Sequence, residues 1–119
     1  MTMARVREWY AVMGEVNELA KSDSSLHVWI EYSLASPIAP HINELQRLPG
    51  MVAVLERHQM STKEFVLLAT LINTGWGALA LIDSLGPAAT PINVGPSLIE
   101  LMRSNRRELD SLRAQLVGR

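Results

Sequence analysis

The chain has 119 residues, a formal net charge of −1 and no cysteine. This length is enough for one hydrophobic core and fits a single domain over residues 1–119. The near-neutral charge offers no electrostatic attraction to nucleic acid or to an anionic membrane, and the lack of cysteine excludes disulfide scaffolds, thiol catalysis and thiolate metal sites.

The first predicted element is an amphipathic helix over Val6–Ala20. Its apolar residues recur at three-and-four spacing, whereas its charged residues fall mainly on other faces. The polar run 21–25 ends the helix. The first residues of the chain contain no apolar segment of the kind found in signal peptides, so we expect no signal peptide in this stretch.

Three shorter elements are predicted next. Ser25–Ala35 favours a helix by the spacing of its leucines and isoleucine, although the run Val28-Trp29-Ile30 leaves a strand open. Prolines 37 and 40 break this pattern because proline lacks an N–H and restricts the residue before it. We expect a helix from Pro40 through Leu48 and another over Met51–His58, with Pro49 in its first turn.

A long helix over Ser61–Leu85 has the strongest start signal in the chain. Ser61 and Glu64 have the spacing of a capping box, in which each side chain bonds the backbone N–H of the other residue. Met60 and Phe65 have the spacing of a hydrophobic staple. Gly86 and the proline after it end the helix.

This helix carries no charged residue from Phe65 to Ile82. Eighteen such residues reach the length at which a membrane span is considered. Threonine, asparagine and glycine residues lower its hydropathy, however, and no Lys/Arg cluster flanks it. We therefore expect no membrane span, and instead a buried helix that neighbouring helices cover on every side.

The last predicted helix begins after Asn93 or Gly95, either of which can cap it, and ends at Gly118. Its inner stripe consists of Leu98, Leu101, Met102, Leu109, Leu112 and Leu116. No segment alternates with period two for long enough to form a sheet. The predicted fold is all-α: a compact single-domain bundle of four to six helices around the apolar helix at 61–85.

Two amides and two neighbouring side chains are the candidate ligand-binding residues. Asn73 lies in the uncharged helix and needs a partner if it is buried, since an unpaired buried amide costs about 1–3 kcal/mol. That partner is either a neighbouring helix or a buried water, or else a ligand in a cavity beside Thr70 and Trp76. Asn105 lies on the apolar stripe of the last helix and is either a core contact or a partner of Asn73.

No catalytic or metal-binding pattern is visible, so we expect neither an enzyme nor a cofactor. The three histidines, His27, His41 and His58, lack the Glu-x-x-His pairs of metal sites in bundles. Haem ligation by His58 with a methionine has no specific support. No Gly-x-Ser-x-Gly elbow or phosphate loop occurs.

Two functions remain open. The first is non-catalytic binding of a small apolar or amphipathic ligand between helices, through Trp76, Asn73, Thr70 and Asn105. The alternative is a self-associating module, for example a homodimer, or a partner-binding helical module. Its interface would use exposed parts of the first helix, namely Trp9, Tyr10 and Met13, or the run Val28-Trp29-Ile30.

Part of the chain resembles a loosely defined family of small, uncharacterised, all-helical bacterial proteins, many of which are exported. The resemblance covers roughly residues 48–110 and rests on the stretch Leu48–Leu67, on Pro91-Ile-Asn-Val94 and on Arg107-Glu-Leu109. It implies that the capped helix and the Asn-Val turn belong to one fold. It also implies a periplasmic location, in place of a cytoplasmic one, but no activity and no functional residues.

Overall fold

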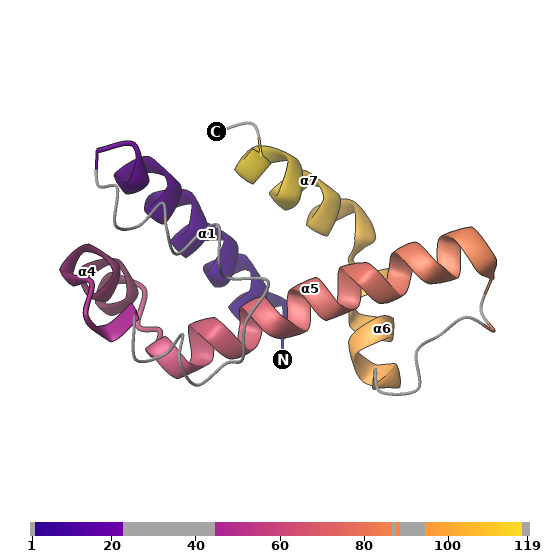
Figure 1. The fold of residues 1–119 in the computed structure, drawn as a ribbon. Coiled ribbons are helices and arrows are strands. Elements are labelled where there is room, and N and C mark those ends of the chain that lie inside the picture. The colour runs from indigo at the N-terminus through magenta and orange to yellow at the C-terminus, as the bar shows by residue number, and fades with distance from the viewer. Residues whose placement is uncertain (1, 23–44, 87, 89–94, 118–119) are drawn as a thin grey trace.

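A computed structural model describes residues 2–22, 45–86, 88 and 95–117. Within these ranges the chain forms five helices and no strand, which confirms the predicted all-α fold (Figure 1). Several predictions lie outside the described residues. They concern the run Val28-Trp29-Ile30, His27, His41 and most of the expected helix from Pro40 to Leu48.

Helix α1 spans Met3–Ala20 and α4 spans Pro49–Arg57. Helix α1 begins three residues earlier than the sequence pattern predicts, because Thr2 acts as its N-cap and its side chain accepts a hydrogen bond from the Arg5 N–H. In α4, Pro49 occupies the first turn as expected, where its missing N–H leaves no intrahelical bond unmade.

Helix α5 spans Thr62–Leu85, and Ser61 is its N-cap. The Ser61 hydroxyl accepts a hydrogen bond from the Glu64 N–H at 3.0 Å, which confirms the cap. The other half of the predicted capping box differs, since the Glu64 carboxylate binds the guanidinium of Arg5 on α1. The staple residues Met60 and Phe65 are both buried in the same core cluster.

The single helix predicted at the C-terminus is two helices, α6 over Pro96–Ser104 and α7 over Arg106–Val117. They separate at Asn105, whose side-chain N–H donates to the carbonyl of Leu101 at 2.8 Å. Asparagine competes in this way with the backbone hydrogen bonds of a helix, which gives the physical reason for the break. The Asn105 carbonyl in turn accepts from the N–H of Leu109 in α7.

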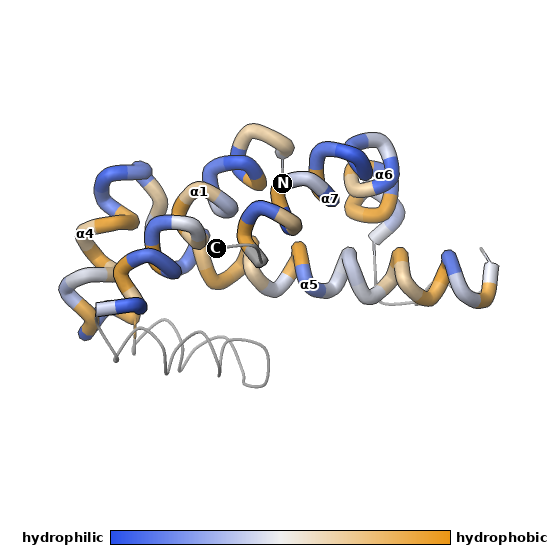
Figure 2. The backbone as a smooth tube through the Cα atoms, turned by 90° about the horizontal axis from the view of Figure 1, so that it is seen from above, coloured by the Kyte–Doolittle hydropathy of each residue, from blue (hydrophilic) through white to orange (hydrophobic). Residues whose placement is uncertain are grey.

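The core lies on one side of α5. Figure 2 shows α1, α6 and α7 on the same side of this helix, with α1 against its N-terminal half and α6 against its C-terminal half. The largest fully buried side chains are Phe65, Leu45, Met51, Ile72, Leu79, Met102, Leu109, Val6, Val12, Val16 and Val54. They come from every described helix, which gives one main core cluster.

Candidate interaction face on helix α5

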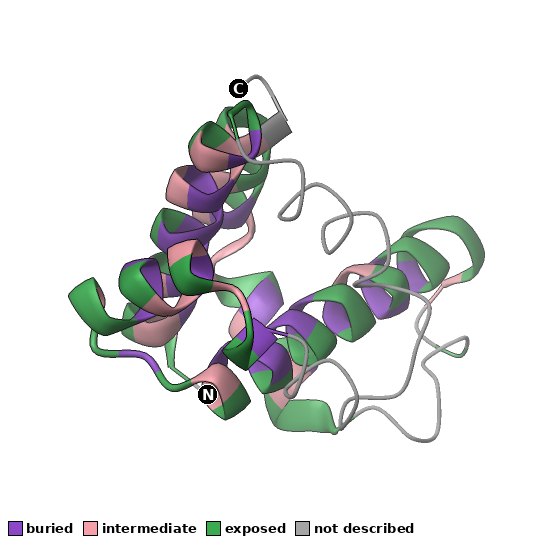
Figure 3. Ribbon diagram, turned by 60° about the vertical axis from the view of Figure 1, so that its left-hand side comes forward, coloured by how far each residue is buried: buried purple, intermediate pink, exposed green. Residues whose placement is uncertain are grey.

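The expectation that neighbouring helices cover α5 on every side is wrong for the described residues. Exposed positions recur at each turn of the helix (Figure 3). Two of them near the helix ends are charged, Lys63 and Asp83. We call the others the outward face of α5: Leu67, Thr70, Leu71, Asn73, Thr74, Gly77, Ala80, Leu81, Ser84 and Leu85. None is charged, so a helix packed on one side only presents an apolar surface on the other.

Four leucines dominate this outward face. Their exposed fractions are 40% for Leu67, 39% for Leu71, 43% for Leu81 and 72% for Leu85. Exposed single leucines are common on protein surfaces, whereas several along one uncharged helix face make that face a candidate interaction site. Near the N-terminal end, an open groove of about 380 Å³ runs beside Lys63, Leu67 and Leu71.

The inward face fixes the orientation of α5. The indole N–H of Trp9 on α1 donates to the Phe65 carbonyl at 3.1 Å, and the two rings stack with centroids 5.8 Å apart. At the other half, Gly75 meets Met102 of α6, and Ala78 and Ile82 form a small cluster with Ile99. These contacts leave the leucines of the outward face pointing away from the core.

Asn73 and Thr70 are exposed, so the prediction that Asn73 is a buried amide is wrong. The reason is that α5 packs through one face, and Asn73 lies on the opposite one. The Thr70 hydroxyl donates to the Val66 carbonyl in the preceding turn at 3.0 Å. Both residues belong to the outward face, and their role in binding a ligand stays a prediction.

Trp76 lies on the other side of α5, half-buried between α1 and α7. Its indole N–H donates to the hydroxyl of Tyr10 at 3.2 Å, and the guanidinium of Arg113 lies 4.7 Å from its ring centroid. Burial raises the pKa of Tyr10, and this effect exceeds the opposing one of the Trp76 hydrogen bond. Trp76 therefore joins three helices, and it does not share a surface with Asn73.

Asn105 is half-buried at the junction of α6 and α7. Its side chain bonds the Leu101 carbonyl of its own segment, so the expectation of a core contact or a pairing with Asn73 is replaced by a role at a helix end. The four candidate ligand-binding residues therefore fall into three separate places.

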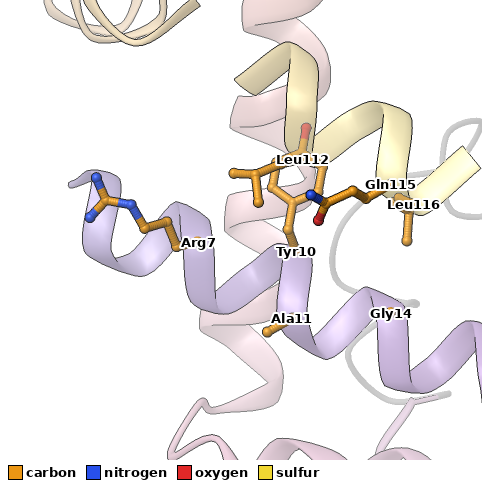
Figure 4. Close-up of a pocket in the computed structure, with 7 residues that line it drawn as sticks. All are labelled: Arg7, Tyr10, Ala11, Gly14, Leu112, Gln115 and Leu116. Atoms are coloured by element: carbon orange, nitrogen blue, oxygen red, sulfur yellow. The ribbon is translucent and has the colours of Figure 1, made fainter. Parts of the chain in front are cut away.

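The described residues do form a cleft, in a different position. It lies between α1 and α7 and has a volume of about 180 Å³ (Figure 4). Its lining consists of Arg7, Tyr10, Ala11, Gly14, Leu112, Gln115 and Leu116. Gly14 and Ala11 have small side chains, which leaves this space between the two helices. Tyr10 and Gln115 supply its polar atoms together with Arg7, which is paired with Glu108 of α7.

A polar cluster joins α1 to the end of α4. The His58 ring bonds Glu8 through Nδ1 and Glu15 through Nε2, and Arg57 binds the second oxygen of Glu15 at 2.6 Å. Burial alone would lower the pKa of His58, but the hydrogen bonds and charges of the two carboxylates raise it above its ordinary value. The hydrogen bonds from Arg57 and His58 lower the pKa of Glu15.

The geometry of this cluster indicates a structural role, because it links α1 to the end of α4. His58 pairs with both carboxylates and Arg57 pairs with Glu15, and none of these residues lines the cleft or belongs to the outward face. Within the described ranges, no three His, Asp or Glu side chains lie close enough together to hold a metal ion. Sequence reasoning missed this cluster because its two carboxylates lie more than 40 residues before His58 in the chain.

The interface proposed on α1 is also wrong. Trp9, Tyr10 and Met13 are all less than one-tenth exposed and belong to the main core cluster. Trp9 contacts Tyr10 edge-on, with ring centroids 5.0 Å apart, and stacks on Phe65. These contacts place the three side chains inside the protein, so they do not form an interface for another protein chain.

Helix α5 is also the one helix, among the described residues, that is long and apolar enough to cross a membrane. Half of its most apolar stretch is buried inside the protein, and the core helix of a soluble protein can be equally long and apolar. Comparison with known proteins adds no further assignment: no family model, no curated protein and no solved structure matches this chain.

Proposed function

We propose that this chain is a helical interaction module that self-associates through the outward face of α5. The observation that carries the proposal is the exposure of four leucines on a face without charge. Water around such a surface is released when two of them meet, which is the main favourable contribution to most protein association.

The spacing on this face favours a helix as the partner. Leu67, Leu71, Thr74, Ala78, Leu81 and Leu85 follow one another at intervals of four and three residues. This is the spacing of a coiled-coil seam, which keeps its apolar residues facing a second helix. Ala78 is already buried beside Ile99 of α6, so the leucines at both ends supply the free apolar area.

The expected affinity is modest. Burying the exposed part of eight leucines, four from each copy, would contribute roughly 6–12 kcal/mol, since a fully buried leucine contributes about 1.5–3 kcal/mol. Loss of translational and rotational freedom costs roughly 4–15 kcal/mol. We therefore expect a dissociation constant on the order of micromolar or weaker.

Sedimentation velocity from about 1 to 500 μM tests this proposal, since that range spans the expected dissociation constant. We expect the wild-type protein to pass from monomer to dimer with rising concentration. Leu71→Glu and Leu81→Glu each place a charge in the seam and should shift the transition to at least about tenfold higher concentration. Ala53→Glu, at an exposed position of α4, is the matched control.

Two results would overturn the proposal. One is a wild-type protein that stays monomeric over the whole range. The other is a dimer that the two glutamate variants leave unchanged, because that dimer would use another surface. Circular dichroism of each variant checks that a change in association does not come from loss of helix.

The cleft between α1 and α7 supports a second candidate function, the binding of a small apolar or amphipathic ligand between helices. Its lining combines leucines with the polar atoms of Tyr10 and Gln115, which is the composition of small-molecule sites. About 180 Å³ is below the roughly 300 Å³ at which drug-sized sites begin, so only a small molecule fits. Native mass spectrometry would detect a bound small molecule as additional mass retained by the protein. Leu112→Trp fills the cleft and should remove that additional mass.

A further inference from the structure

We infer that the two copies of α5 pair antiparallel, about a twofold axis at the level of residue 76. The inference rests on the proposed self-association and adds the orientation and register of the two helices. In this arrangement Leu67 lies opposite the partner's Leu85, and Leu71 lies opposite the partner's Leu81.

The positions of the four exposed leucines carry the inference. Leu67 and Leu85 lie nine residues on either side of position 76, and Leu71 and Leu81 lie five residues on either side. An antiparallel pair places each residue before the axis opposite the residue equally far after it. All four leucines therefore meet leucines, which fixes the register of an antiparallel pair. An in-register parallel pair also matches leucine with leucine, so the orientation rests on the charges at the helix ends.

The seam between the leucine layers is narrow. Thr74 and Ala78 lie opposite each other across the inferred axis, and Gly77 adjoins them. A Cβ atom built on Gly77 would have no atom within 4 Å, so the surface there is open. Because Ile99 of α6 already covers Ala78, the close approach at the crossing point is through Thr74 and Gly77, and the leucine layers at both ends supply the main contact.

Charge separates this orientation from a parallel one. An in-register parallel pair would place Lys63 beside the partner's Lys63, at ends of α5 that both carry a positive partial charge. The antiparallel pair places Lys63 near the C-terminal end of the partner's α5, where the last carbonyls carry a negative partial charge. The exposed Lys63 is then an attractive contact at each end of the dimer.

Spin-label distances test the orientation without changing any leucine. The chain has no cysteine, so Thr62→Cys and Ser84→Cys each give one labelling site per copy and leave Lys63 in place. With 1.5 Å of rise per residue and helices about 10 Å apart, the antiparallel dimer predicts label separations of about 43 Å at position 62 and about 26 Å at position 84. A parallel dimer predicts separations near 10–20 Å at both positions, allowing for the label arms.

Disulfide trapping provides a second measurement. Leu67→Cys and Leu85→Cys proteins, mixed and oxidised, should form a mixed covalent dimer in at least about tenfold higher yield than either alone, because position 67 lies about 27 Å from the partner's position 67. Leu71→Cys with Leu81→Cys should behave in the same way. Leu67→Cys with Leu81→Cys is the control for register, since it is offset by one helical turn.

The outcomes separate the inference from the proposed function. A dimer with short distances at both labels, or with single-cysteine variants that trap themselves, overturns the antiparallel register and leaves self-association intact. A dimer that traps the offset pair best also overturns the register. A protein that stays monomeric overturns both, whereas the two long distances together with the two mixed traps support both.

Discussion

Gly75 of α5 packs directly against Met102 of α6: a Cβ atom added to Gly75 would lie 1.9 Å from the Met102 sulfur. Met102 is fully buried, so its side chain fills the space that the glycine leaves. This contact fixes α6 against the C-terminal half of α5 and thereby leaves the outward face on the other side.

Gly75→Ala should therefore destabilise the protein by about 1–3 kcal/mol, the usual cost of overpacking a buried contact. The flexible Met102 side chain can move, which keeps the cost within this range. Gly77→Ala is the matched control. It adds a methyl group in open space and should stabilise the helix by roughly 0.5–1 kcal/mol, since alanine favours a helix more than glycine does.

Urea unfolding at a protein concentration low enough to keep the chain monomeric measures both free energies of unfolding. The gain in helix propensity applies at both positions, so the difference between the two variants measures the overpacking at Gly75. A Gly75→Ala protein as stable as Gly77→Ala would contradict the packing of α6 on α5.

The His58 cluster makes stability depend on pH in two directions. The folded-state pKa of His58 lies above its ordinary value of 6.5, so its stabilisation is present below pH 6.5 and is lost as the pH rises through the folded pKa. The folded-state pKa of Glu15 lies below its ordinary value of 4.5, so its stabilisation is lost as the pH falls through that lower pKa. We expect the greatest stability between about pH 4.5 and 6.5.

The free energy of unfolding in urea, measured from pH 4 to pH 9, checks this dependence. The glutamine of His58→Gln cannot become charged, so this variant should lose most of the decrease in stability above pH 6.5. The remaining histidines stay in the chain as an internal control. An unchanged pH profile in this variant would show that other groups cause the decrease.

The limits of the helices could be predicted from sequence where a local signal exists. Ser61 caps α5 and Pro49 begins α4 because a cap or an N-terminal proline acts within four residues. Asn105 also acts locally, through the carbonyl four residues before it. The break between α6 and α7 could therefore have been predicted from the presence of an asparagine on an apolar stripe.

The face through which α5 packs could not be predicted in the same way. An ordinary surface helix marks its exposed side with charges, but α5 has none between Glu64 and Asp83. Burial of Asn73 was a reasonable expectation for that reason, and the structure shows it exposed. The one available signal was the four-and-three spacing that includes Leu67, Leu71 and Leu81, which resembles a seam for a second helix.

Tyr10→Phe should lower the free energy of unfolding by about 0.5–1.5 kcal/mol, because it removes the acceptor of the Trp76 indole N–H. The half-buried position of Trp76 keeps the cost below that of a fully buried donor without a partner. The matched control is the same change in a Trp76→Phe background, where the hydrogen bond is already gone. A double-mutant cycle in urea measures the coupling, and a coupling near zero would contradict this contact.

Ser61→Ala should destabilise the protein by about 1 kcal/mol, because the N–H of Glu64 loses its acceptor at the start of α5. Ser61→Gly should cost only a few tenths of a kcal/mol, since glycine opens that N–H to water. Thr2→Ala serves as a comparison, because the Thr2 cap of α1 has a longer contact, 3.4 Å against 3.0 Å, and should cost less.

Thermal and urea unfolding of the three variants rank these costs. The order Ser61→Ala, then Thr2→Ala, then Ser61→Gly follows if the cap acts through its hydrogen bond. If the serine acts through its hydrogen bond, water can replace the hydroxyl in the glycine variant, which then loses less stability. Equal losses of stability from the alanine and glycine variants at position 61 would mean instead that the serine acts through packing. The cap would then contribute to α5 through its contacts with the surrounding loop, and Glu64, held by Arg5, would be the residue that fixes the first turn.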